Sequence, residues 1–315
     1  MDLKDIALID IRGRELIHSL FPAAPTLEEF RQLSAHGSSS WCWLPMEHIQ
    51  YAKAGKFCVS QTRARDTWEI INMRNAFLNG VQPVRMDYKR LIAFHTLTRL
   101  GDLLTTDQPN EIFTQWSAFH KAHGDVLVSG LGLGMALHMI ADMRPVRSVT
   151  VVEMEADVIK LAQPLLRALR RKYSITVIHD DIFEYLNMLS ETKQPLYDFA
   201  YHDIWYGTGE TVWCDRMVPL YRATRKASIN HMGGWCERDM QQQMANSLWS
   251  MAHVDPDRKW FPYRVFVDGI KKNAGVVLPY KGNDESLLAL IKLYLMEVGT
   301  PKWEQTFNWD ITNEK

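Results

Sequence analysis

The sequence has few cysteines and no long apolar run, and both absences narrow the class of protein. The four cysteines stand far apart and form no C-x-x-C pair, so neither a disulfide framework nor a zinc knuckle is expected. No stretch approaches the roughly 20 apolar residues of a membrane span, and charges interrupt the N-terminal segment as they would not in a signal peptide. We therefore expect a cytoplasmic protein without a membrane partner.

A strong net charge of either sign is missing as well. The formal charge of -1 and the pI of about 6.8 give no electrostatic argument for nucleic acid as a required partner. A basic run at 167–172 is typical of the solvated face of a helix, although such runs also contact phosphates in nucleic-acid-binding proteins. His120 and His123 form an H-x-x-H pair without an evident third ligand, so no metal site is expected.

Alternating strands and helices are the main signal that is present. Apolar runs at 126–129, 148–152, 175–178 and 197–201 predict strands, and helical patterns separate them at 135–140, 156–172 (interrupted by Pro164) and 182–189. This order predicts an α/β fold with parallel strands joined by helical crossovers. Two late strands are expected at 264–267 and 275–278, and a helix at 285–297.

The chain before these elements predicts a smaller region. A hairpin is expected from 91–94 and 103–106, a helix from 109–122, and a helix start at Thr26 and Glu29. We therefore divide the chain into an N-terminal helical and β-hairpin region, 1–108, and an α/β domain, 109–315. Residues 206–260, which are rich in Trp, Met, Arg and Gln, are expected to form an insertion in that domain.

A glycine-rich turn follows the first strand of the α/β domain. Gly130, Gly132 and Gly134 allow the backbone to approach a ligand without intervening Cβ atoms. The dinucleotide fingerprint would place its third glycine at position 135, which is Met135. Glu153 ends the second strand about 20 residues later, where an acid can accept hydrogen bonds from both hydroxyls of a ribose.

A third feature follows the third strand. Asp181 is suited to the amino group of adenine, and Ile182 to the face of its ring. These features, in this order after consecutive strands, predict a nucleoside-type site. The alternative is a doubly wound domain with ordinary turn glycines and strand-end acids.

These segments resemble the motifs of a known family. Residues 124–134, 151–159 and 181–185 are similar to the first three motifs of the class I S-adenosylmethionine-dependent methyltransferase superfamily. Within it the chain most resembles the spermidine synthase-like proteins, which share an apolar residue at Val128 and a hairpin exit like 103–111. The resemblance spans about residues 81–206. It implies a Rossmann-like methyltransferase fold with a mostly parallel, seven-stranded sheet, and S-adenosyl-L-methionine or its decarboxylated form as cofactor.

The resemblance also assigns roles to individual residues. Asp198 and Asp203 have the spacing of the spermidine synthase aspartate pair, which implies that Asp203 is catalytic. Tyr206 is its candidate partner, for proton transfer or for lining the pocket, whereas strand alternation points His202 to the opposite face. The implied cofactor contacts are Gly130, Leu131, Gly132, Gly134, Glu153, Met154, Asp181, Ile182 and Asp203.

The chain also departs from the spermidine synthase pattern. Leu133 stands where those proteins carry an acid that holds the amine end of the cofactor. Their Ser/Thr-rich, Asp-Pro-containing loop is replaced by residues 204–209, which lack the polyamine-binding acids. These departures favour methyl transfer to a small-molecule acceptor, which is unidentified and is expected to bear an amine.

Three alternatives stay open at the level of sequence. One is an aminopropyltransferase of the spermidine synthase type. Another is a DNA amino-methyltransferase, because Asp203 and Tyr206 have the Asp-x-x-Tyr spacing of those enzymes without their intervening prolines. The third is a non-catalytic protein that binds S-adenosylmethionine. A homodimer is suggested by analogy with the family alone.

Overall fold

The computed structural model describes residues 15–17, 19–20, 51–65, 91–107, 111, 114–115, 118–192, 196–254, 265–266 and 284–307. Contacts group the chain into two compact units. The helical unit consists of Met1–Ala24, Gly207–Lys226 and Glu237–Lys315, and the sheet unit of Pro25–Tyr206 and Ala227–Cys236. The division predicted at residue 108 stays a prediction, as does the helix start at Thr26, which lies outside the described residues.

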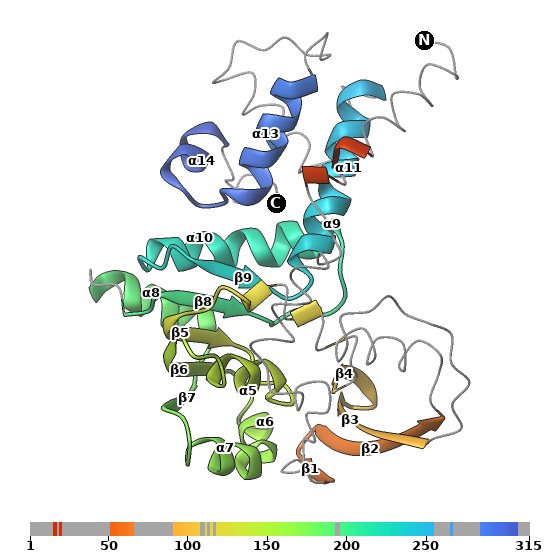
Figure 1. The fold of residues 1–315 in the computed structure, drawn as a ribbon, viewed down its shortest axis with the longest axis vertical. Coiled ribbons are helices and arrows are strands. Elements are labelled where there is room, and N and C mark those ends of the chain that lie inside the picture. The colour runs from red at the N-terminus through yellow and green to blue at the C-terminus, as the bar shows by residue number, and fades with distance from the viewer. Residues whose placement is uncertain are drawn as a thin grey trace. The chain divides into compact units, whose positions relative to one another are not determined.

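A parallel sheet forms the centre of the sheet unit (Figure 1). Its strands are β5 (Gly124–Ser129), β6 (Val146–Glu153), β7 (Ile175–His179), β8 (Phe199–His202) and β9 (Met232–Gly234). Their order in the sheet is β7-β6-β5-β8-β9, and all neighbours are parallel. This is the order of doubly wound sheets, whose direction of winding reverses between β5 and β8. The predicted α/β fold and its first four strands are confirmed.

The later strands differ from the expectation. β9 lies within residues 206–260, which the sequence analysis assigns to an insertion, yet it pairs with β8 as the fifth strand. Val265 and Phe266 are helical, so the strand predicted at 264–267 is wrong at these positions. The strand predicted at 275–278 lies outside the described residues. Within the described residues the parallel sheet therefore has five strands, and the predicted count of seven is not confirmed.

Helices connect the strands as predicted. α5 (Met135–Ala141) follows β5, α6 (Ala156–Leu161) and α7 (Gln163–Leu169) follow β6, and α8 (Ile182–Thr192) follows β7. Pro164 lies in the first turn of α7, where its missing N–H has no partner to lose, and this explains the break between α6 and α7.

A second, antiparallel sheet belongs to the same unit. It consists of β1 (Ala52–Ala54), β2 (Phe57–Arg65), β3 (Leu91–Arg99) and β4 (Asp102–Thr106) in sequence order, and its last two strands confirm the predicted hairpin. Phe57, Val59 and Leu97 on its inner face share one apolar core with β5, β6 and α5–α7. Lys56 adds an ion pair of 2.7 Å to Glu155, just after β6.

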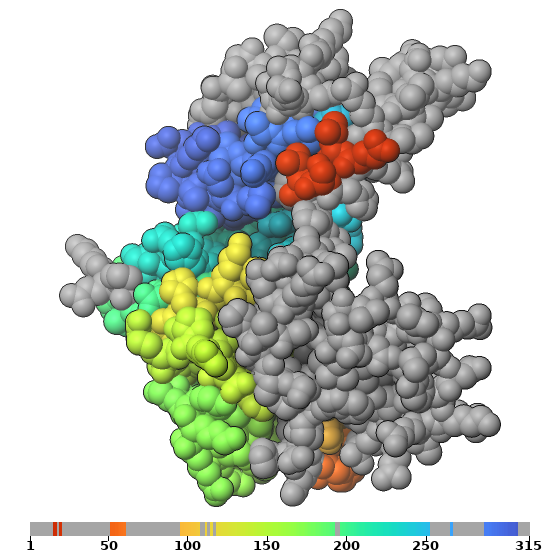
Figure 2. All heavy atoms as spheres, in the orientation of Figure 1, coloured from red at the N-terminus to blue at the C-terminus, as the bar shows by residue number. Residues whose placement is uncertain are grey.

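The helical unit contains α9 (Glu210–Val212), η2 (Trp213–Met217), α10 (Val218–Lys226), α11 (Glu237–Val254), α13 (Asp284–Met296) and α14 (Pro301–Thr306). The last two pack into one continuous body, blue in Figure 2. Tyr294 is its centre, because its ring lies 4.9 Å from that of Phe307 and its carbonyl accepts from Trp303 Nε1 at 3.0 Å. Among the described helices, none combines the length and apolarity needed to cross a bilayer.

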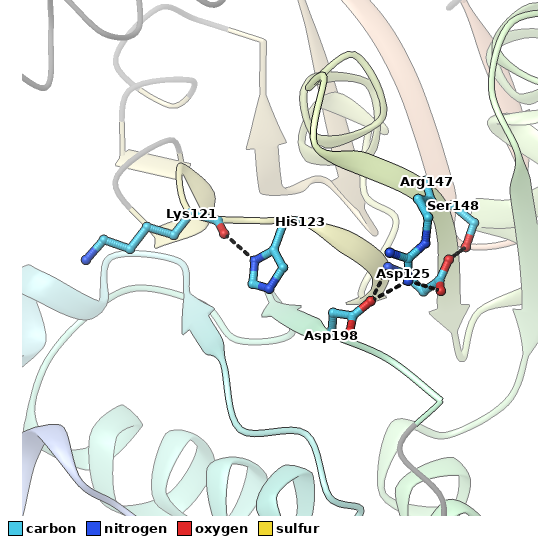
Figure 3. A network of polar contacts seen from close by, with 6 residues as sticks. All are labelled: Lys121, His123, Asp125, Arg147, Ser148 and Asp198. Carbon is cyan, nitrogen blue, oxygen red and sulfur yellow. Dashed lines mark hydrogen bonds and ion pairs between the residues drawn. The ribbon is translucent and has the colours of Figure 1, made fainter.

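A polar network joins the amino ends of β5, β6 and β8 (Figure 3). The Arg147 guanidinium donates to Asp125 at 2.6 Å and to Asp198 at 2.7 Å, and Ser148 donates to Asp125 at 2.7 Å. Asp198 also accepts from the backbone N–H of Asp125 at 2.9 Å. Asp198, the first member of the aspartate pair, therefore lies at the amino edge of the sheet, whereas ligands bind such sheets at the carboxyl edge.

This network predicts unequal effects of removing its two charges. Asp198→Ala leaves the Asp125 N–H without its acceptor, so the free energy of unfolding should fall by about 1–2 kcal/mol. Arg147→Met removes only exposed ion pairs and should cost less than about 1 kcal/mol. Chemical denaturation of both variants measures the difference, and a larger loss for Arg147→Met would contradict it.

Candidate functional site

The glycine turn closes tightly over the end of β8. Gly130 and Gly134 have φ of +87° and +79°, which favour glycine. A Cβ at Gly130 would collide with the Asp203 carbonyl oxygen, and one at Gly134 with Leu165. A Cβ at Gly132 would meet only a Thr105 methyl, at 3.4 Å. Close packing thus explains why positions 130 and 134 are glycines. At Gly132, in the middle of the turn, there is space beside the backbone.

Glu153 holds this turn in place. Its Oε2 accepts from the Leu131 N–H at 2.8 Å, and its Oε1 accepts from the Glu155 N–H at 2.9 Å. Burial raises the pKa of Glu153, and hydrogen bonds from backbone N–H groups oppose that rise. A carboxylate has about four acceptor positions, so both oxygens retain capacity for further donors.

The other residues assigned to the cofactor lie around this carboxylate with different exposures. Leu131 and Leu133 are buried in the core, so at Leu131 only the backbone takes part in the turn. Met154 is 63% exposed beside Glu153. Asp181 is half-buried and accepts from the Phe183 N–H at 2.7 Å, which caps the first turn of α8, while Ile182 is buried. Their roles toward a cofactor stay predictions.

Asp203 follows β8 directly and receives a side-chain partner from a helical segment. Residues 111, 114–115 and 118–119 are helical, as predicted for 109–122. The Phe119 ring packs edge-on against Tyr201 at 5.2 Å, and the Gln115 Nε2 donates to Asp203 Oδ2 at 3.2 Å.

Matching periods explain this arrangement. Glu111, Gln115 and Phe119 are spaced by one helical turn, about 6 Å of rise. Tyr201 and Asp203 are two strand positions apart, about 6.6 Å. Phe119 can therefore contact Tyr201 while Gln115 contacts Asp203, and Glu111 lies one helical turn before Gln115. The Thr105 hydroxyl donates to its Oε1 at 3.4 Å.

The carboxyl groups of Asp203 and Glu111 both have raised pKa values. Burial, followed by the nearby Glu111 carboxylate, raises the pKa of Asp203 to about 8. Burial raises the pKa of Glu111 to about 7, and the Thr105 hydrogen bond opposes this. Between them Gln115 is 2% exposed, and its Oε1 has no hydrogen-bond partner in the described part of the chain. Buried, charge-coupled carboxyls with an unsatisfied amide are typical of a functional site.

The neighbours of Asp203 differ in exposure. His202 is fully buried on the opposite face of β8, where its Nδ1 lies 2.5 Å from Ser129 Oγ, and burial lowers its pKa to about 3. Trp205 is buried and donates to the Trp235 carbonyl at 3.3 Å, which favours packing over stacking on a substrate. Tyr206 is 60% exposed.

Sequence reasoning assigned no role to Glu111 or Gln115. Their i, i+4 spacing within a predicted helix was the available signal, because such residues share a helix face. The residue they face, Asp203, was assigned from the family resemblance alone.

Comparisons with known proteins show only a coarse likeness. No family model and no curated protein matches the chain. Spermidine synthase from Thermotoga maritima aligns with a TM-score of 0.35 and 15% identity, over 49% of this chain and 60% of that one. A spermidine synthase in complex with the transition state analogue AdoDATO has a TM-score of 0.34 and 15% identity, over 49% and 59%.

Another similar structure belongs to a different class of enzyme, a reductase. The pyrroline-2-carboxylate reductase of Thermococcus litoralis, in complex with NADH and L-proline, has a TM-score of 0.23 and 10% identity, over 59% of this chain and 60% of that one. The chain thus spans about 60% of the length of these proteins.

The raised pKa values predict how stability depends on pH. With pKa values of about 8 and about 7, Asp203 and Glu111 stay largely protonated below these pH values in the folded chain, whereas in the unfolded chain they ionise near their ordinary pKa values of 3.8 and 4.5. The folded state binds more protons between these limits, so their contribution to stability falls as pH rises. Asp203→Asn and Glu111→Gln should therefore gain stability relative to wild type between pH 4 and pH 8.

Denaturant titrations across this range measure the effect. Asp215→Asn, at an exposed position, is the control and should show a pH-independent difference from wild type. A constant difference for Asp203→Asn as well would mean that Asp203 ionises normally.

Proposed function

We propose that the chain is an S-adenosylmethionine-dependent methyltransferase with a small, amine-bearing acceptor. The observation that carries the proposal is the meeting of the glycine turn, Glu153 and Asp203 at the carboxyl ends of β6, β5 and β8. These strands flank the point where the order of the sheet reverses, and doubly wound domains bind nucleotides in the crevice at that point.

The residues around the turn fit a nucleoside with a short tail. The two Glu153 oxygens each retain acceptor capacity for a ribose hydroxyl, in addition to the backbone N–H groups that they already bind. Asp181 lies at the end of the neighbouring strand, where the adenine amino group would be placed. Met135, at the position of the third dinucleotide glycine, is buried in the core, which favours this cofactor over a dinucleotide.

The cluster around Asp203 fits an amine. Asp203, Glu111 and the unpartnered Oε1 of Gln115 are all acceptors, and an ammonium group carries three N–H donors. A bound cation also offsets the mutual repulsion of two ionised carboxylates. When bound, S-adenosylmethionine supplies a methyl group on a sulfonium sulfur. Asp203 would then orient the acceptor nitrogen toward that methyl group, which is the main task of an enzyme in such a displacement.

Leu133 bears on the choice between methyl and aminopropyl transfer. Its side chain belongs to the buried core, where an acid would lack partners. This supports a carboxylated cofactor. Calorimetric titration with S-adenosylmethionine, S-adenosylhomocysteine and decarboxylated S-adenosylmethionine tests the choice. Preference for the decarboxylated compound would favour aminopropyl transfer, and binding of none would refute the proposal.

Glu153 should contribute directly to the affinity for the cofactor. Glu153→Ala removes acceptors for the ribose hydroxyls, so binding of S-adenosylhomocysteine should weaken by about 1–3 kcal/mol. Because this change also frees the Leu131 N–H, Glu153→Gln serves as the matched control that keeps an acceptor for the turn. Circular dichroism confirms folding, and unchanged affinity in a folded Glu153→Ala protein would remove Glu153 from the site.

Asp203 should affect turnover and not cofactor affinity. Asp203→Asn keeps an acceptor for Gln115 but has no charge for the acceptor nitrogen, so methyl transfer should fall by about 10²–10⁴-fold. Release of S-adenosylhomocysteine is measured in a screen of small amines, with calorimetry as the check on cofactor binding. Full turnover in this variant would exclude the catalytic role. Cofactor binding without turnover of any amine would favour a non-catalytic binding protein.

A further inference from the structure

A histidine and an aspartate form a closed pair on the hairpin, outside the residues discussed so far. His95 Nδ1 lies 2.7 Å from Asp107 Oδ2, and the His95 backbone N–H donates to Asp107 Oδ1 at 2.6 Å. The two side chains are 14% and 5% exposed. Because an ionised carboxylate can only accept, Nδ1 must carry the proton, and in the neutral imidazole Nε2 is then a bare acceptor.

Strand register places this pair beside the glycine turn. Thr105 pairs with Leu97 in the hairpin, and the next position on the same face pairs Asp107 with His95, whose carbonyl accepts from the Asp107 N–H at 3.2 Å. Leu97 lies in the core, and Thr105 touches the open position at Gly132 and binds Glu111. The His95 ring is therefore on the face that covers the candidate site, about 7 Å further along the strands.

The site needs a proton acceptor that its two acids do not supply. Without a cation beside them, burial raises the pKa of Asp203 to about 8 and that of Glu111 to about 7. In the proposed complex both carboxylates are occupied in holding the acceptor nitrogen. His202 is sealed on the other face of β8. An imidazole whose Nδ1 is bound to a buried carboxylate is the usual chemical solution, since the carboxylate stabilises the imidazolium that forms.

We propose that His95, oriented by Asp107, is the general base of the site, a role that rests on the proposed methyl transfer. Before the transfer, His95 Nε2 takes a proton from the bound ammonium group, which frees the lone pair of the acceptor nitrogen. The bond from that nitrogen to the methyl carbon then forms as the bond from the methyl carbon to sulfur breaks. The sulfonium becomes a neutral thioether, the methylated nitrogen takes up the positive charge that sulfur loses, and the imidazolium beside Asp107 carries the proton of the former ammonium group. Asp203 and Glu111 hold the acceptor and exchange no proton in this step.

Labelling with diethyl pyrocarbonate tests the imidazole directly, because the reagent acylates a bare and reachable nitrogen. Trypsin releases His95 in the peptide Leu91–Arg99, which contains no other histidine, and His202 in the peptide 194–216, which also contains no other. His95 should be acylated and the sealed His202 should not. Saturating S-adenosylhomocysteine should protect His95.

Each outcome of the labelling is decisive when calorimetry is run beside it. No acylation of His95 would show a sealed structural pair and overturn the proposal. Acylation that bound S-adenosylhomocysteine does not reduce would place the ring away from the site, which also overturns it. If calorimetry detects no binding of S-adenosylhomocysteine, the proposed function itself fails, and the role of base fails with it.

Two variants separate catalysis from a structural link. In His95→Asn the amide N–H can replace Nδ1 as donor to Asp107 while Nε2 is lost, so the melting temperature should be retained and methyl transfer should fall by about 10²–10⁴-fold. In Asp107→Asn the charge that stabilises the imidazolium is lost, so turnover and acylation should both fall. Full turnover by His95→Asn would exclude His95 as the base.

Discussion

The buried carboxylate of Glu153 fixes two backbone segments at once, and the geometry of the site depends on it. A charge removed from water costs several kcal/mol unless it is hydrogen-bonded. Here one oxygen holds the Leu131 N–H of the glycine turn, and the other holds the Glu155 N–H beyond β6. Because Gly130 in that turn packs against the Asp203 carbonyl, the end of β8 is positioned from the same anchor. An acid at this strand end therefore organises three strands before any ligand is bound.

A second constraint acts from the helical segment that follows the hairpin. Phe119 packs on Tyr201, and Gly233 lets the Ala118 carbonyl approach β9 closely. This packing fixes the distance between the helical segment and the sheet. The position of Gln115 relative to Asp203 is therefore restricted. The result places partly buried acids next to each other, an arrangement that lowers stability when both are ionised. Proteins retain such arrangements mainly where function needs them, which is the reason to regard the cluster as a site.

Sequence patterns predicted the elements that are determined by local residue order. They missed the features that depend on contacts between distant segments. Strands β5 to β8 have apolar runs that periodicity detects, and the turn glycines follow directly. β9 escaped because Met232 and two glycines carry no strand signal. The run at Val265 and Phe266 illustrates the opposite error, since a short apolar stretch fits a buried helix as well as a strand. Gln115 meets Asp203 across many intervening residues, and no local pattern encodes that contact.

His202 and His95, which are both bound through Nδ1, show why the environment, and not the residue type, decides chemistry. His202 faces the hydroxyl of Ser129 in a sealed interior, where burial lowers its pKa to about 3. His95 faces the carboxylate of Asp107 with part of its ring still exposed. A hydroxyl can donate or accept and so fixes no tautomer, whereas a carboxylate fixes the tautomer and also compensates the charge that a base acquires. The proposed role of base is therefore assigned to His95 and not to His202.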